Sequence, residues 1–307
     1  MAGRSLPMMV GMAVGSVDAL TARLARRSTH PVPIPQPIVV GVSGGALAAT
    51  AVALGIDRDR ARQLATAHPE QDVLGPRSFR AMLSRQGLYP EARIRELAHA
   101  IAGDRTFADF AVDPKPADHQ PHRFTSSLLI PVYSAKYGTL LLPRDLPVLG
   151  LSDLPVADAL VAATRIPGAL PAAAGLEDLF DGGCQYRVPH DIFAPHRALV
   201  LDLYGPRPYD SRGGLIFPLL HPSLPVVPRR PRPFHDETVR ESTIFAHQPY
   251  GAALKTPVRT TGELFDTGYD IATKWIDSRT EEQLLNFVDR DGLPERTVTG
   301  TRTETIA

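Results

Sequence analysis

The stretch that decides the fold reads Ile38-Val39-Val40-Gly41-Val42-Ser43-Gly44-Gly45-Ala46-Leu47. An apolar, β-branched run ends abruptly in Gly-x-Ser-x-Gly, and small residues with helical character follow as far as Leu54. This order predicts a strand, a tight turn with Ser43 at its tip, and then a helix. Gly41 and Gly45 are expected to let the two backbones approach each other closely around the turn.

Two interpretations of this pentapeptide are open. In the first, Ser43 is a nucleophile at the N-terminus of a helix, where the helix dipole and free N–H groups favour a developing oxyanion. The N–H of Gly44 is then the first donor of an oxyanion hole. In the second, the stretch is a glycine-rich turn with an incidental serine, since short motifs also arise by chance.

A second motif lies further along the chain. An Ala-rich helical segment that begins near Asp158 ends in Ile166-Pro167-Gly168-Ala169-Leu170-Pro171, and Asp181-Gly182-Gly183 follows. Taken alone, Asp-Gly-Gly is most often simply a turn. Together with residues 41–45 it resembles the patatin-like phospholipase family, in order and spacing, from about Gly11 to about Pro189. The segments Thr106–Phe110 and Leu128–Tyr133 also resemble that family.

The resemblance implies a serine acyl hydrolase whose substrate is a lipid or phospholipid. It implies Ser43 as the nucleophile and Asp181 as the general base that accepts its proton, with no catalytic histidine and no cofactor or metal. Gly182 and Gly183 would let the backbone bring the carboxylate within reach of the serine. Because a carboxylate is a weak base in water, we expect Asp181 to lie in a dry environment.

The chain departs from the family pattern at two places. Arg187, six residues after Asp181, stands where the family usually carries Asn. The glycine-rich loop that supplies the main oxyanion donors in the family is not recognisable. Gly3, Arg4 and Gly11 are the remaining candidates for such donors. We expect instead that the first strand and this loop are encoded upstream of Met1, and that the 307 residues form a poor hydrolase.

Two alternatives to an active patatin-like enzyme therefore remain. The chain could be a catalytically weak relative that acts as a lipid- or partner-binding module. It could also be an ordinary α/β-hydrolase, which needs a histidine after the acid. Five histidines qualify for that role by order alone, although none sits in a matching motif: His190, His196, His221, His235 and His247.

Composition limits the class of protein. The chain has 307 residues, 43% of them hydrophobic, which is enough for one large core. A formal net charge of +0 argues against nucleic acid as a partner. No run of about 18 apolar residues and no convincing signal peptide are present, so we expect a cytoplasmic protein, in contact with a membrane at most peripherally. The single cysteine, Cys184, is expected to be a buried filler.

Alternating helical and apolar extended segments predict an α/β fold. By resemblance it would be a three-layer sandwich with a largely parallel central sheet and helices on both faces. We expect one domain over residues 1–290 and a polar tail over 291–307. A Pro-rich insertion over 205–234 combines apolar residues with an arginine cluster, which predicts either a lid in contact with the membrane or ordinary core packing. Asp118, His119 and His122 lie in a loop that resembles a metal site but is expected to be solvated.

Helices are expected over Gly11–Arg27, Ala46–Leu54, about 57–67, Pro76–Gln86, Pro90–Ala102 and Glu263–Ile276. Strands are expected over Ser127–Ser134, Thr139–Leu142 and Arg197–Tyr204.

Overall fold

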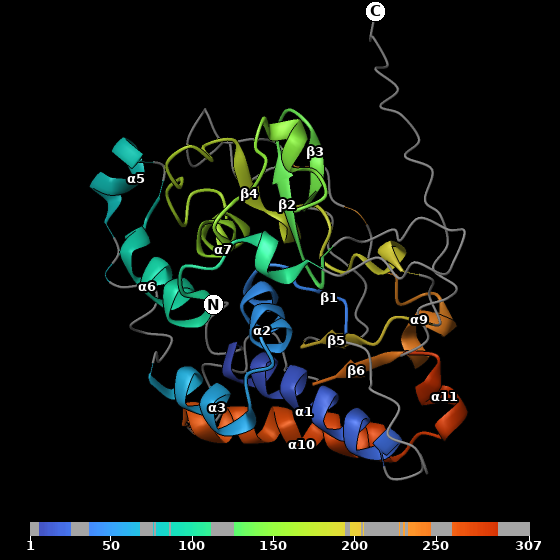
Figure 1. The fold of residues 1–307 in the computed structure, drawn as a ribbon. Helices are drawn as coiled ribbons and strands as arrows, with labels where there is room; N and C mark the ends of the chain where they lie inside the picture. The colour runs from blue at the N-terminus through green and yellow to red at the C-terminus, as the bar shows by residue number, and fades with distance from the viewer. Residues whose placement is uncertain are drawn as a thin grey trace, which may run out of the picture.

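The structure is a computed structural model that describes residues 6–25, 37–67, 78–85, 87–111, 126–193, 197–203, 233–246 and 260–287, and residues 76, 205, 227 and 230. Figure 1 shows how these parts are arranged. The helices are α1 (Leu6–Ala25), α2 (Gly44–Ala53), α3 (Arg58–Ala67), α5 (Phe79–Arg85), α6 (Glu91–Ala102), α7 (Val156–Thr164), α9 (Glu237–Glu241), α10 (Thr261–Asp277) and α11 (Glu281–Leu285). The strands are β1 (Val39–Val40), β2 (Leu128–Ser134), β3 (Gly138–Leu142), β4 (Leu179–Asp181), β5 (Val200–Asp202) and β6 (Thr243–Phe245).

Every helix and strand predicted from the sequence is present, although several bounds differ by a few residues. Local signals account for where the helices begin. Asp57 accepts a hydrogen bond of 2.8 Å from the Arg60 N–H at the start of α3. Pro90 is the N-cap of α6. Thr260 and Glu263 form a capping box at the start of α10.

The main sheet has four strands, and β2 is its centre. Strand β1 pairs with β2 in parallel, whereas β3 and β4 both pair with β2 antiparallel. A separate two-stranded parallel sheet joins β5 to β6. Among the described strands the sheet is therefore mixed, and the predicted largely parallel central sheet is not confirmed. The antiparallel β3 follows from the hairpin turn at 135–137, which returns the chain directly beside β2.

Strands β1 and β4 share one edge of β2 and run toward each other. The other edge is occupied by β3, which pairs with Ile130 to Ser134. On the shared edge, β1 lies beside Leu128 and Leu129, and β4 lies beside Val132 to Ser134. The pairing of β1 and the pairing of β4 with β2 thus end on either side of Pro131. The nitrogen of Pro131 carries no hydrogen and cannot donate a hydrogen bond to a neighbouring strand. The two sequence motifs begin at this junction.

The two faces of β2 pack against different partners. Leu128, Ile130 and Val132 belong to a large apolar core with α2, α6 and α7. On the opposite face, Leu129 packs against Ile192, and Tyr133 packs against Phe180 and Cys184. Within the described residues, helices therefore cover one face of this sheet and turns after Asp181 contribute to the other, which differs from the predicted helices on both faces.

Helices α1 and α10 lie side by side along one side of the molecule (Figure 1). Their backbones touch through glycine: a Cβ on Gly11 would lie 2.1 Å from the Phe265 carbonyl oxygen, and one on Gly268 would lie 2.1 Å from that of Met8. Of the described helices, α1 is long and apolar enough to cross a membrane by length and composition, with 50% of its apolar window buried in the protein. Through this contact with α10, α1 packs into the core of the protein.

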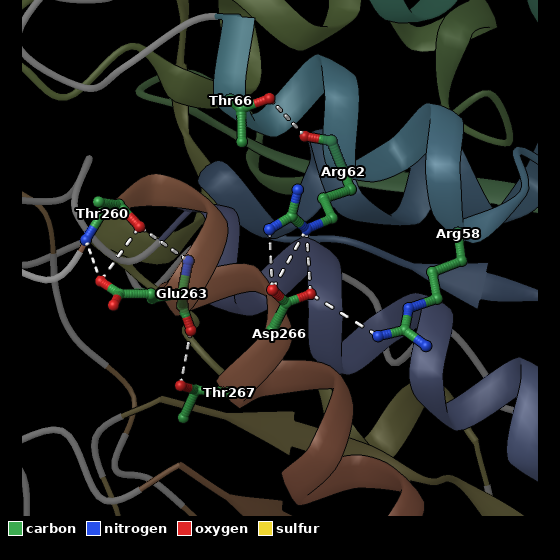
Figure 2. Close-up of polar contacts among 7 residues, drawn as sticks. All are labelled: Arg58, Arg62, Thr66, Thr260, Glu263, Asp266 and Thr267. Carbon is green, nitrogen blue, oxygen red and sulfur yellow. Dashed lines mark hydrogen bonds and ion pairs between the residues drawn. The ribbon is translucent and has the colours of Figure 1, made fainter.

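An ion pair links α10 to α3 (Figure 2). The Arg62 guanidinium binds both carboxylate oxygens of Asp266, with Nη2 2.9 Å from Oδ2, and Arg58 adds a longer contact of 3.7 Å. These side chains are substantially exposed, so the pair contributes little to stability. The last major helix is therefore held mainly by its apolar face, with Phe265 and Ile276 fully buried.

Candidate active site

Ser43 occupies a strained turn between β1 and α2. Its φ of 56° and ψ of −130° are unusual, and within the described residues no other non-glycine residue has a positive φ. Such a conformation costs of order 1–3 kcal/mol and is found preferentially at functional sites. The expected strained turn is therefore present, with the hydroxyl-bearing residue at its tip.

The two glycines that flank this turn are not equivalent. A Cβ on Gly41 would lie 2.4 Å from the Gly45 carbonyl oxygen and 2.5 Å from the Ala46 Cα, so only glycine fits there. A Cβ on Gly45 would meet no atom within 4 Å. Close approach of strand and helix therefore explains Gly41 but not Gly45.

Asp181 is the last residue of β4 and lies beside this turn. Its backbone N–H donates to the Arg165 carbonyl oxygen at 2.8 Å, and the residue is only 3% exposed. One carboxylate oxygen, Oδ1, accepts a hydrogen bond of 2.7 Å from the Gly183 N–H. The Ser43 side chain lies close enough to this carboxylate to lower its pKa. The two motifs, 138 positions apart in the chain (181 − 43), thus meet through their polar side chains.

The surroundings of Asp181 make it a better base than an exposed carboxylate. Burial raises the pKa of its carboxyl from 3.8 to about 6, while the Ser43 side chain, the Gly183 N–H and the positive charge of Arg187 oppose this rise. The group is ionised above about pH 6 and can then accept a proton. The expectation of a dry environment is confirmed.

The glycines that follow Asp181 are required by close contacts on two sides. A Cβ on Gly182 would lie 2.5 Å from the Pro131 carbonyl oxygen, on the edge of β2. A Cβ on Gly183 would lie 3.1 Å from Val42 Cγ1, in the turn that carries Ser43. The loop can therefore fit between the sheet and the serine turn only if residue 182 is glycine. At residue 183 a side chain would be in tight contact with Val42.

The N–H of Gly44 is available as an oxyanion donor. Within the described residues it has no acceptor, whereas the N–H groups of Gly45 and Ala46 donate to the carbonyl oxygens of Val42 and Ser43. The start of α1 lies against this corner, because a Cβ on Gly44 would be 4.0 Å from Leu6 Cδ1. The positive ends of two helix dipoles, those of α1 and α2, therefore lie close together here.

The other predicted oxyanion donors were Gly11, Gly3 and Arg4. Gly11 was a wrong candidate: it lies inside α1, where the N–H is hydrogen-bonded within the helix, and its missing side chain is explained by the contact with Phe265. Gly3 and Arg4 lie outside the described residues, just before α1.

The described histidines do not complete a triad with Ser43. His190 contacts the Tyr186 hydroxyl (Nδ1 to Oη, 3.3 Å) and the Val188 carbonyl oxygen, and His235 is exposed. The groups that influence Asp181 are Ser43, Gly183 and Arg187, with no histidine among them. His196, His221 and His247, and the sequence Asp118 to His122, lie outside the described residues. In the part of the chain that is described, no group of three His, Cys, Asp or Glu side chains could hold a metal ion.

Arg165 is a supporting residue that no sequence pattern predicted. It is 2% exposed, its guanidinium stacks 4.1 Å above the Phe180 ring, and its Nη1 donates to the carbonyl oxygens of Glu177 and Leu179. Since its own carbonyl accepts the Asp181 N–H, Arg165 fastens β4 at several points. A lone arginine between an Ala-rich helix and an apolar segment is the signal that could have pointed to it, because buried arginines are nearly always paired.

A second polar cluster lies beyond the Asp-Gly-Gly turn. Tyr186 donates a hydrogen bond to Asp191, and Arg230 lies 4.7 Å from the centre of the Tyr186 ring and 3.8 Å from Asp191. Val227, 2% exposed, packs with Phe180 and Cys184. Val227 and Arg230 of the Pro-rich segment thus pack on the residues around Asp181-Gly182-Gly183, while most of 205–234, including Arg229 and Arg232, lies outside the described residues. Cys184 is buried, as predicted.

Comparison with known proteins identifies the two motifs as parts of one family pattern. The model of the family described as patatin-like phospholipase matches residues 13–194, which is more than half of the chain and includes both Ser43 and Asp181. No curated protein matches the chain.

Proposed function

Since the chain belongs to the patatin-like phospholipase family, we propose that it is a lipid acyl hydrolase in which Ser43 and Asp181 form a catalytic dyad. Members of this family are lipid hydrolases. The proposal adds the residues, the order of proton transfers and an ester of a fatty acid as the substrate.

The reaction begins with proton transfer from the Ser43 hydroxyl to the Asp181 carboxylate, as the Ser43 oxygen attacks the acyl carbonyl carbon. Negative charge develops on the carbonyl oxygen, where the Gly44 N–H and the start of α2 stabilise it. Asp181 then gives the proton to the departing alcohol, which leaves an ester on Ser43. Water attacks this ester, Asp181 accepts a proton from the water, and the free acid and the serine hydroxyl are restored.

One observation carries the proposal: Ser43, in its turn with φ of 56°, lies next to the buried Asp181 carboxyl, whose pKa burial raises to about 6. A general base works best when its pKa lies near the working pH, so Asp181 is matched to a proton acceptor at neutral pH. The strained φ of 56° at Ser43 supports the same assignment, because a purely structural turn would favour glycine there.

A catalytically weak, lipid-binding relative is the second candidate. The observation that favours it is that Gly44 offers one free N–H, whereas loss of a single oxyanion donor typically lowers the rate about 100- to 1000-fold. The first turn of α1, against Leu6, is the nearest place for further donors, since the first N–H groups of a helix have no partner within it.

The experiment is hydrolysis of a chromogenic short-chain ester by the wild-type chain and by the Ser43→Ala and Asp181→Asn variants. Both variants are expected to lose nearly all activity, and the double variant to be no slower than either single variant, because the two side chains act as one unit. A double variant much slower than both would contradict the dyad. A wild-type chain that binds phospholipid without turnover would favour the second candidate.

A further inference from the structure

Helix α5 presents apolar side chains to solvent. Phe79 is 77% exposed and Leu83 is 74% exposed, the highest values among the large hydrophobic residues described as exposed. They stand four positions apart, so both project from the same side of the helix. A single exposed leucine is ordinary, but a neighbouring phenylalanine and leucine at this exposure form an apolar contact site.

Beside this exposed pair, α5 is attached to the protein. Met82 is 6% exposed and packs in a cluster with Phe180 and Cys184, the residues on either side of Asp181-Gly182-Gly183. The helix is also bound at its ends, because the Ser78 N–H donates to the Leu88 carbonyl oxygen at 2.7 Å. The Leu88 N–H in turn donates to Gly168 at 3.1 Å. The exposed side of α5 is therefore held in place by the same elements that position the site.

The charge of α5 favours an anionic partner. Its sequence is Phe-Arg-Ala-Met-Leu-Ser-Arg, which contains two arginines and no acidic residue. Arg80 is exposed and lies next to Phe79. Helices that lie at a lipid surface combine phenylalanine and leucine with basic residues in this way, the apolar side chains entering the acyl boundary and the cations meeting anionic head groups.

The size of the apolar site argues against a second copy of the chain as its occupant. A stable protein interface buries roughly 800 Å² on each partner. An aromatic side chain offers only about 150–250 Å² in total. Phe79 and Leu83 together therefore fall well short, whereas insertion into a lipid surface has no such threshold. Figure 1 shows α5 at the periphery of the molecule.

We propose that α5 is a membrane-contacting helix, which inserts Phe79 and Leu83 into an anionic phospholipid surface and so brings the Ser43 site to its lipid substrate. This rests on the proposed function for the identity of the substrate, but not for the binding itself.

The test measures binding to vesicles apart from catalysis. In a Ser43→Ala background, which leaves the lipids intact, flotation with phosphatidylcholine vesicles is compared with and without phosphatidylglycerol. The Phe79→Ser/Leu83→Ser variant is expected to bind phosphatidylglycerol vesicles at least about tenfold more weakly, because two large apolar side chains no longer leave water. The control is Leu285→Ser: Leu285 is 48% exposed on α11, which lies across the molecule from α5 in Figure 1. It should change binding less than about twofold.

A second measurement does not depend on removing side chains. The Phe79→Trp variant should show a blue shift of fluorescence on addition of the vesicles, and the Leu285→Trp variant should not. Vesicle binding that the double variant retains, no binding by the parent chain, or a parent chain that forms dimers dispersed by the double substitution would each overturn the proposal.

Ester hydrolysis tests the proposed function separately from membrane binding. With Ser43 restored, the double variant should hydrolyse a soluble short-chain ester at the wild-type rate, since neither side chain contacts the site. If the wild-type chain itself does not hydrolyse the ester, the proposed function fails, while the vesicle result still decides the role of α5.

Discussion

Replacement of the buried carboxyl by its neutral amide, Asp181→Asn, should make the protein more stable at neutral pH. Burial raises the pKa of Asp181 from 3.8 to about 6, so ionisation of this group opposes folding. Each pKa unit corresponds to about 1.4 kcal/mol, and a rise of about two units therefore corresponds to roughly 3 kcal/mol. The amide has nearly the same shape, and its oxygen can still accept from the Gly183 N–H. The stabilisation should approach this value, less whatever the weaker hydrogen bonds remove.

The pH dependence follows from the sign of the shift. Below about pH 4 the carboxyl is protonated in both the folded and the unfolded chain, so wild type and variant should be equally stable. Between about pH 4 and pH 6 the unfolded chain releases its proton first, and the wild type loses stability relative to the variant. Above about pH 6 the difference should be complete and constant.

Urea unfolding of both proteins from pH 4 to pH 8 measures this difference. The Ser43→Ala variant is the control, because it keeps the titrating carboxyl and should keep the loss of stability as the pH rises. Two results would refute the conclusion that burial raises the pKa of Asp181 and so opposes folding. One is an Asp181→Asn variant that is equally stable or less stable than the wild type at pH 8. The other is a difference in stability that does not change with pH.

Three further predictions follow from the contacts at the site. Gly41→Ala should destabilise the protein by at least about 1–3 kcal/mol, because its Cβ would overlap backbone atoms, whereas Gly45→Ala should change stability by less than about 1 kcal/mol; urea unfolding compares them, and equal effects would contradict the packing at the turn. Arg165→Met should cost about 2–4 kcal/mol and lower ester hydrolysis, since two carbonyl oxygens that it pairs lose their donor; an unchanged rate and stability would remove its positioning role. Arg187→Met should raise the pKa of Asp181 further, so the acidic limb of the pH profile of kcat/KM should move to higher pH, and a profile that does not move would show that its charge does not act on the carboxyl.

The sequence predicted the serine turn and the helices well because their causes are local. A β-branched run, a glycine where two backbones touch, and capping residues such as Asp57 and Thr260 act within a few positions of where they stand. Apolar runs likewise predicted the strands β2 and β3. These signals need no knowledge of the rest of the chain.

The arrangement of the sheet could not be predicted in the same way. Whether β4 runs parallel or antiparallel to β2 depends on which edge of β2 is free, and that edge is shared with β1. The function of Gly11 was misread for a similar reason. Its partner, Phe265, stands more than 250 positions away, and only the contact between α1 and α10 shows why a glycine is needed. Long-range packing of this kind leaves no pattern in the local sequence.

The central claim, that Ser43 is a nucleophile activated by Asp181, is tested most directly by reaction with a fluorophosphonate probe followed by mass spectrometry of the peptides. We predict a single adduct on Ser43 in the wild-type chain, formed much more slowly in Asp181→Asn and not at all in Ser43→Ala. A wild-type chain that forms no adduct, or one that carries the adduct on another serine, would contradict the claim.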